Sequence, residues 1–325
     1  MSELVKENKE LEEKNRYSAP NNKKLNGKNS FKKNIPFYLI LLPAVITVFM
    51  VQYLPMFGLL IAFKDYSVKG GIFGSPWASM HGFANFAYIF ETPDFLDAVW
   101  NTLWLNVLSL IFSFPAPIIL ALLINEVGKK GFKRAVQTIS YLPHFLSIAA
   151  VTTIVNQLLG NYGLLNAMLQ AFGVDPVYLL EKESAFVPTY VITEIWQTVG
   201  WGTIVYLATI TGINSDLYEA AQIDGASRLQ QVLKITLPSI LPTTMILLIM
   251  KMGTLFGSSF EMVYGLQNPV AWTDDVIATA IYKYGIGQGE YAVSTALGLM
   301  QGVIAFSLTF ITNGISKKVS DISMW

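Results

Sequence analysis

The sequence predicts an all-α integral membrane protein that crosses the bilayer six times and keeps both termini in the cytoplasm. Of its 325 residues, 53% are hydrophobic and only 14% are charged, whereas soluble domains carry roughly a quarter charged residues. The net charge is zero at pH 7, so the basic field expected of a nucleic-acid-binding protein is missing. The chain has no cysteine, which excludes disulfides, thiolate metal sites and a cysteine nucleophile.

Six apolar stretches predict the membrane spans, because a helix needs about 20 mostly apolar residues to cross the hydrocarbon core. Five of these stretches are charge-free, and the sixth is interrupted only by Lys251. Extended or trimmed to plausible helices, the predicted spans are residues 37–62, 100–125, 135–159, 187–211, 240–261 and 291–315. The segment 64–97 between the first two spans is expected to carry short structure of its own.

The distribution of Lys and Arg orients these spans, because positively charged loops are retained in the cytoplasm. With the amino terminus inside, the cytoplasmic segments hold 17 Lys and Arg residues and the outside segments hold four. Residues 1–35 are rich in Lys, Glu and Asn and have few apolar positions, so we expect a disordered cytoplasmic tail there. The remaining residues, 36–325, are predicted to form a six-helix transmembrane domain with its core at about 95–318.

The cytoplasmic segment 214–238 is long for a connection between two helices, and such length is typical of a functional loop. Ser215 or Asp216 can cap a first short helix, and Gly225 can end it in a left-handed conformation. A second, amphipathic helix is expected to follow and to stop at Pro238. From pattern alone, this segment could simply be an interfacial helix that anchors spans four and five.

The same segment carries a set of residue types at fixed spacing. They are Glu219, Ala220, Ala221, Asp224, Gly225, Ile235, Leu237 and Pro238. This pattern resembles the EAA loop of binding-protein-dependent ABC importer permeases, with one departure at Val232, where an aromatic residue is usual. In that family the loop is the coupling helix, which docks in a cleft on the cytoplasmic ATPase. The resemblance implies a type I ABC importer (MetI-like) permease fold and an ATPase-coupling role for these eight residues.

The resemblance extends over roughly residues 80–318. The runs Tyr141–Ser147 and Asn161–Leu169 are similar to the carbohydrate branch of the family, nearest to a subgroup associated with complex oligosaccharides in Gram-positive bacteria. It implies one half of a heterodimeric channel that imports an oligosaccharide across a bacterial plasma membrane. The implied partners are a second related permease, two ATPase subunits and an extracellular substrate-binding lipoprotein.

Nothing in the sequence points to chemistry carried out by this chain itself. No Gly-x-x-x-x-Gly-Lys-Ser/Thr motif is present, so this chain is not the ATPase and ATP and magnesium would be bound by the partner. The two histidines, His81 and His144, are far apart and belong to no metal-spaced cluster. We therefore expect no enzymatic activity, metal or cofactor in this chain.

Two predicted spans carry polar stripes, which are informative because polar groups at depth usually face a cavity or a partner. On span four the stripe is Tyr190, Glu194, Gln197 and Trp201, and on span five it is Lys251, Thr254, Ser258 and Glu261. Their helical spacing places each set on one helix face. At about 1.5 Å per residue, Glu194 and Lys251 both come near mid-depth and could lie within a turn of each other.

Two interpretations of these stripes stay open. They could line a translocation path, where aromatic faces pack on sugars and amides or carboxylates bond hydroxyls. Alternatively, Glu194 and Lys251 could form a buried pair that holds spans four and five together, or face the partner subunit. Two alternative functions also stay open: a secondary transporter or channel that works without an ATPase and uses these two residues for ions, and an ABC permease for a solute other than a sugar.

Overall fold

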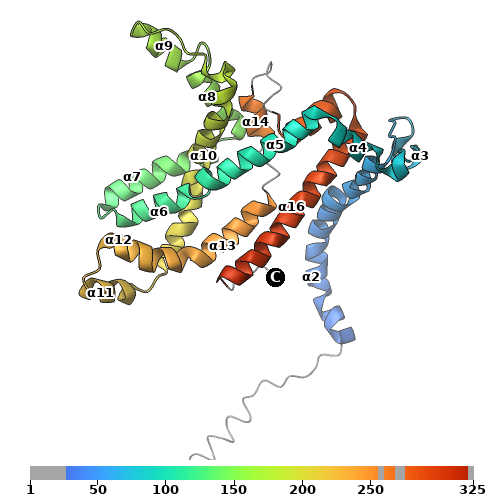
Figure 1. Ribbon diagram of the computed structural model, residues 1–325. Helices are drawn as coiled ribbons and strands as arrows, with labels where there is room; N and C mark the ends of the chain where they lie inside the picture. Colours follow the sequence, from blue (N-terminus) through green and yellow to red (C-terminus); the bar gives the residue numbers. More distant parts are fainter. Residues whose placement is uncertain (1–26, 255–259, 268–274, 321–325) are drawn as a thin grey trace, which may run out of the picture. The chain divides into compact units, whose positions relative to one another are not determined.

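The computed structural model describes residues 27–254, 260–267 and 275–320 (Figure 1). The chain separates into two compact units, Met1–Phe57 and Gly58–Trp325. Within the described residues the secondary structure is helical, apart from an isolated antiparallel bridge between Lys64 and Trp77. The predicted all-α class is therefore confirmed for the described part of the chain.

The first unit is built from one apolar helix. Helix α2 covers Gly27–Val48, and the π turn η1, Phe49–Tyr53, continues it. The helix begins well before the predicted span start at residue 37, because lysines are good helix formers and continue it toward the amino terminus. The predicted disordered tail, 1–35, thus overlaps α2 at its end, and its residues 1–26 lie outside the described residues. The apolar side chains from Ile35 onward are exposed in this chain, as expected of a helix covered by lipid or by a partner.

The second unit opens with short elements in the segment where the sequence predicted them. These are the 3-10 helix η2 (Leu54–Phe63, which begins in the first unit), α3 (Gly71–Gly74), η3 (Met80–Gly82) and α4 (Ala84–Glu91). The buried Lys64 holds them together, since its Nζ donates to the carbonyl oxygens of Ser75 at 3.0 Å and Phe73 at 3.4 Å. Asn85 also holds these elements together, because its side-chain amide donates to the carbonyl oxygens of Ala62 and Lys64.

The rest of the described second unit is a series of helices, some long and some of a single turn. In chain order they are α5 (Pro93–Leu108), η4 (Ser109–Ser113), α6 (Ala116–Glu126), α7 (Lys130–Tyr141), η5 (Leu142–Phe145), α8 (Ile148–Leu159), α9 (Leu164–Ala171), η6 (Leu179–Glu181), α10 (Glu183–Thr211), α11 (Ser215–Ile223), α12 (Arg228–Gln231), η7 (Val232–Thr236), α13 (Leu237–Gly253), α14 (Phe260–Leu266), α15 (Ile277–Ala280), η9 (Ile281–Gly287) and α16 (Tyr291–Ser320). In Figure 1, α6 runs beside α7, and α13 runs beside α16.

Five helical stretches of the described chain are long and apolar enough to cross a membrane. They are Asn34–Phe63, Pro93–Glu126, Ile148–Ala171, Arg228–Gly253 and Tyr291–Lys318. Helix α10 has 29 residues, a length of about 43 Å, but it is more polar than these five. The structure therefore supports the multi-span character of the protein, and α10 is the remaining candidate for a sixth crossing.

Two of the predicted span helices are broken. The predicted helix 135–159 is interrupted at η5, because Pro143 has no N–H to donate and the Ser147 hydroxyl starts α8 by accepting from the Ala150 N–H at 3.2 Å. The predicted helix 240–261 ends at Gly253, where Thr254 already has non-helical dihedral angles, and α14 begins only at Phe260. Glu261 therefore does not continue the helix face that carries Lys251.

The second unit is held by three apolar clusters. One joins Phe95 of α5 to Leu297 of α16, another joins Leu105 of α5 to Val263 of α14, and the third joins Ile124 of α6 to α10 and α13. Glycines let the helices of this unit approach closely. A Cβ built on Gly200 of α10 would lie 2.0 Å from the carbonyl oxygen of Ser140 in α7, so only glycine fits there.

We expect Gly200→Ala to destabilise the purified chain by about 1–3 kcal/mol, because the added methyl group forces α10 away from α7. Gly302→Ala is the matched control, since it makes the same change in a helix but its Cβ meets nothing within 4 Å. The measurement is the thermal unfolding midpoint of both variants in detergent. Equal midpoints would contradict the close contact of α7 with α10.

Candidate functional site

The loop 214–238 forms a compact helix–turn–helix structure between α10 and α13. Its first helix, α11, is capped by Asn214, whose side chain accepts from the Asp216 N–H at 3.0 Å. The predicted caps, Ser215 and Asp216, are one and two residues too late, because the amide oxygen of Asn214 already satisfies the first free N–H group. Gly225 follows α11 with φ +78°, so the predicted left-handed turn is confirmed.

The second arm of the loop does not stop where the sequence predicted. Ser227 caps α12 through a capping box with Gln230. The chain then passes through the π turn η7 directly into α13, with Pro238 in the first turn of that helix. Because the Leu237 N–H donates to the Val232 carbonyl one residue further back than in an α-helix, the turn makes room for the proline ring.

Five of the eight predicted coupling residues are exposed, whereas Leu237, at the start of α13, packs against the apolar cluster of α6, α10 and α13. Exposed positions are Glu219, Ala220, Asp224, Gly225 and Pro238, and half-buried ones are Ala221, Ile235 and Leu237. Two apolar side chains that the sequence reasoning did not single out, Ile223 and Leu229, are 87% and 67% exposed. Uncovered apolar groups of this kind are typical of a docking surface.

Side-chain contacts join the two arms of the loop to each other and the loop to α6. The Tyr218 hydroxyl of α11 lies 2.9 Å from the Thr236 hydroxyl in η7. Arg228 at the start of α12 lies 3.5 Å from the carboxylate of Glu126 at the end of α6. The loop is therefore an ordered helical structure and not a loose connection.

A polar cluster joins the two helices that flank this loop, at Glu194 within α10 and at Lys251 in the last turn of α13. Lys251 of α13 lies with its Nζ 3.1 Å from Oε1 of Glu194 in α10. The same carboxylate accepts from the hydroxyls of Ser109, at 2.9 Å, and Ser113, at 2.8 Å. The predicted pair is thus present, and both charges are neutralised inside the chain. The two serines could have been suspected from their spacing of four residues, which places them on one helix face.

The remaining residues of the predicted path fall into different surroundings. Tyr190 and Gln197 are buried, at 4% and 7% exposure, whereas Trp201 is 49% exposed. The Trp201 ring stacks on His144, with centroids 4.6 Å apart and an angle of 9°, and Phe145 meets it edge-on. His144 thus supports the tryptophan. Thr254 lies just beyond α13 and donates to the Lys251 carbonyl, and Ser258 lies outside the described residues.

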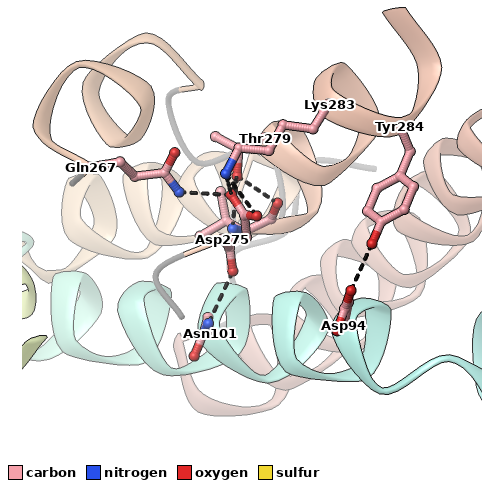
Figure 2. A network of polar contacts seen from close by, with 8 residues as sticks. Asp94, Asn101, Gln267, Asp275, Thr279, Lys283 and Tyr284 are labelled. Carbon is pink, nitrogen blue, oxygen red and sulfur yellow. Dashed lines mark hydrogen bonds and ion pairs between the residues drawn. The ribbon is translucent and has the colours of Figure 1, made fainter. Parts of the chain in front are cut away.

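A second polar network joins the start of α5 to the segment before α16 (Figure 2). The Asp275 carboxylate accepts from Lys283 at 2.7 Å, Gln267 at 2.8 Å and Thr279 at 2.9 Å. Its backbone carbonyl accepts from the Asn101 amide at 3.0 Å. Among the described residues, no group of three or more His, Asp or Glu side chains is placed to hold a metal ion. This network therefore joins helices.

The edge of this network contains a tyrosine with a perturbed pKa. The Tyr284 hydroxyl donates to the Asp94 carboxylate at 2.8 Å. Burial, together with the hydrogen bond and negative charge of Asp94, raises the pKa of Tyr284 to about 12. The neutral phenol is therefore favoured by folding, so its stabilising contribution is complete below pH 10 and is lost as the pH rises toward 12.

A helical protein with several apolar spans, internally paired charges and one ordered, uncovered loop has the construction of a membrane transport component. Comparisons with known proteins identify the family of transport proteins. Residues 113–321 match the family described as "Binding-protein-dependent transport system inner membrane component". The chain belongs to this family.

Relatives and solved structures agree with this family. LplB of Bacillus subtilis (strain 168) is 40% identical over 291 residues, which are 89% of this chain and 91% of that protein. The polygalacturonan/rhamnogalacturonan transport system permease protein YteP of the same organism is 40% identical over 286 residues, 87% of this chain and 88% of YteP. A bacterial ABC transporter involved in the import of the acidic polysaccharide alginate matches with a TM-score of 0.83 at 41% identity, covering 90% of this chain and 98% of that chain.

A second structure of the alginate transporter, in complex with an alginate pentasaccharide-bound periplasmic protein, matches with a TM-score of 0.83 at 40% identity, covering 91% of this chain and 99% of that chain. The likeness confirms the predicted MetI-like permease fold. The protein is thus a transport permease of the bacterial cell membrane that crosses the bilayer several times, and not an enzyme.

We expect the titration of tyrosines in the folded protein to include one phenol with a pKa of about 12 that is absent from Tyr284→Phe. Asp94→Asn should move this pKa back toward 10, because the negative charge that opposes ionisation is gone. The measurement is the phenolate absorbance of the three proteins against pH. Loss of a phenol that ionises near pH 10 in Tyr284→Phe would contradict the assignment.

Proposed function

We propose that this chain is the permease subunit of an ATP-driven importer for oligosaccharides, forming one half of the translocation path. The observation that carries the proposal is the ordered, uncovered loop 214–238, set between two long helices of a chain from a binding-protein-dependent transport family. Such a loop offers a separate subunit a firm contact through which force reaches the membrane. The eight EAA-type residues are the proposed contact with that ATPase.

The proposed cargo follows from the relatives. YteP is named for polygalacturonan and rhamnogalacturonan transport, and the alginate transporter imports an acidic polysaccharide. Both are saccharide chains, which favours an oligosaccharide over the alternative of an amino acid, phosphate or metal. The identity of the sugar would be set largely by an extracellular binding lipoprotein, the third kind of partner after a second permease and two ATPase subunits.

The proposed topology has six spans with both termini in the cytoplasm. Five apolar stretches supply five spans, and α10 supplies the sixth. The Lys and Arg excess in the segments assigned to the inside supports this orientation. It places the loop 214–238 in the cytoplasm, where an ATPase that binds ATP and magnesium can reach it, and leaves this chain without a cofactor of its own.

In the proposed mechanism, ATP binding closes the ATPase dimer and moves the loop with it. Helices α10 and α13 leave the two ends of the loop, so they carry the displacement into the membrane and turn the path from inward-facing to outward-facing. This is alternating access driven from outside the chain.

The proposed path is lined by the stripe on α10 and its neighbours on α13. Trp201, half exposed and held by His144, offers an aromatic face to the C–H surface of a sugar ring. Gln197 lies one turn from Trp201 on the same face of α10, although only 7% of it is exposed in this chain. The path residues predicted from the sequence also include Tyr190, Glu194, Lys251, Thr254 and Ser258, but the first three are tied into the chain by burial or by pairing.

The alternative of a secondary transporter or channel gains no support from the described residues. It requires Glu194 and Lys251 to handle ions, yet each neutralises the other and two serines satisfy the carboxylate. A family defined by dependence on a binding protein also favours the importer.

The direct test is to purify the tagged chain from native membranes in mild detergent and to identify its companions by mass spectrometry. We expect an ATPase, a second permease and a lipoprotein to be recovered with it. Repeated recovery of the chain alone in several detergents would overturn the proposal.

We expect Gly225→Asp to leave the protein in the membrane and to abolish both sugar uptake and the coupled ATPase activity, because it places a strained, charged side chain on the contact with the ATPase. Gly225→Asn is the matched control, since it has the same shape without the charge and asparagine accepts positive φ more readily than most residues. If Gly225→Asn keeps function and Gly225→Asp loses it, the effect is due to the charge on this surface. Normal uptake in Gly225→Asp would refute the docking role.

A further inference from the structure

The loop 214–238 connects two helices that are also joined to each other inside the membrane. Helix α10 enters the loop and α13 leaves it. Three polar contacts link the two sides at increasing distance from the loop. These contacts are Tyr218 with Thr236 at 2.9 Å, Thr209 with Thr243 at 3.3 Å, and Glu194 with Lys251 at 3.1 Å. The third contact lies about 30 Å along α10 from the start of the loop.

The third contact differs from the other two in strength and in consequence. The first two join neutral hydroxyls, whereas the third joins opposite charges through a charge-assisted hydrogen bond. The Glu194 and Lys251 side chains are 13% and 32% exposed, so separating them would leave the carboxylate with little access to water. The pair therefore strongly opposes any movement of α10 relative to α13.

The serines extend the same contact to another span. Ser109 and Ser113 lie on the π turn between α5 and α6, and both hydroxyls point to the Glu194 carboxylate. One carboxylate thus fastens span two, α10 and α13 at a single level. A displacement that reaches this level is passed on to all three.

We propose that the Glu194–Lys251 pair is a positioning contact that makes α10, the loop 214–238 and α13 move as one unit, so that a displacement of the loop reaches the middle of the membrane. This inference rests on the proposed function, because it needs an ATPase that moves the loop. It assigns the pair to transmission and not to sugar binding. The pair acts through the helices that it holds, without touching the substrate.

The absence of cysteine from the chain allows the test to use single cysteine reporters. The assembly, with its second permease, ATPase and lipoprotein, is reconstituted in nanodiscs and trapped with ATP and vanadate. A bimane label is placed on Ile223→Cys in the loop or on Ile192→Cys beyond the pair, since these side chains are 87% and 66% exposed. The assembly that contains the cysteine-free chain, treated with the same label, gives the background signal from cysteines of the partner subunits.

We expect both reporters to change fluorescence on trapping when the pair is intact. In Glu194→Gln and in Lys251→Met, the loop reporter should still respond, whereas the response at residue 192 should be largely lost. The reversed pair, Glu194→Lys with Lys251→Glu, should restore the response at residue 192. The reversed pair also keeps the test decisive if a single variant fails to assemble.

Lys283→Met is the matched control, because it breaks a comparable ion pair, that with Asp275 at 2.7 Å, which lies outside the helices that flank the loop. Both reporters should keep their response in it. A full response at residue 192 in the assembled single variants would overturn the inference, because a pair that only contacts sugar predicts that result. A reversed pair that assembles but does not restore the response at residue 192 would overturn it as well. An intact assembly in which the loop itself does not respond would overturn the proposed function, and the role of the pair with it.

Discussion

The constraint on which this structure depends is the cost of an unpaired polar group in hydrocarbon. The chain meets it at Glu194, whose carboxylate receives one ammonium group and two hydroxyls from other helices. Its partners come from α13 and from the turn between α5 and α6, so the same bonds that satisfy the charge also determine which helices lie together. The Asp275 network applies the same solution where α5 meets the segment before α16.

Three prolines in the described part of the chain each follow a π turn. In three places a π turn is closed by an N–H that reaches back five residues, and a proline follows directly: Leu54 before Pro55, Phe114 before Pro115, and Leu237 before Pro238. The extra residue in the turn relieves the clash between the proline ring and the preceding carbonyl. It also rotates the helix, which at Ser109 and Ser113 aims two hydroxyls at one carboxylate and at Val232–Thr236 connects the loop to α13 without a break.

The two halves of the proposed site rely on different physics. The loop 214–238 is stabilised by local devices: an asparagine cap, a left-handed glycine and a capping box. It keeps its shape while leaving Ile223 and Leu229 uncovered. The polar groups at depth are held by contacts between residues far apart in the chain. An ordered surface at one end and a polar crosslink at the other suit a part that transmits movement without deforming.

The sequence by itself determined the all-α membrane class, the presence of several apolar stretches long enough to cross a membrane, the likeness to the permease family and the glycine that ends α11. Apolar length and local turn chemistry are properties of neighbouring residues. The prediction from the sequence misplaced the cap of α11 and extended two helices across breaks. It also ended a helix at Pro238, because whether proline breaks a helix depends on the backbone turn before it. Pairing of Glu194 with Lys251 was one of two interpretations that the spacing allowed. Only the tertiary structure decided it, together with the serines that complete the site and the stacking of His144 on Trp201, because these contacts depend on the approach of separate helices.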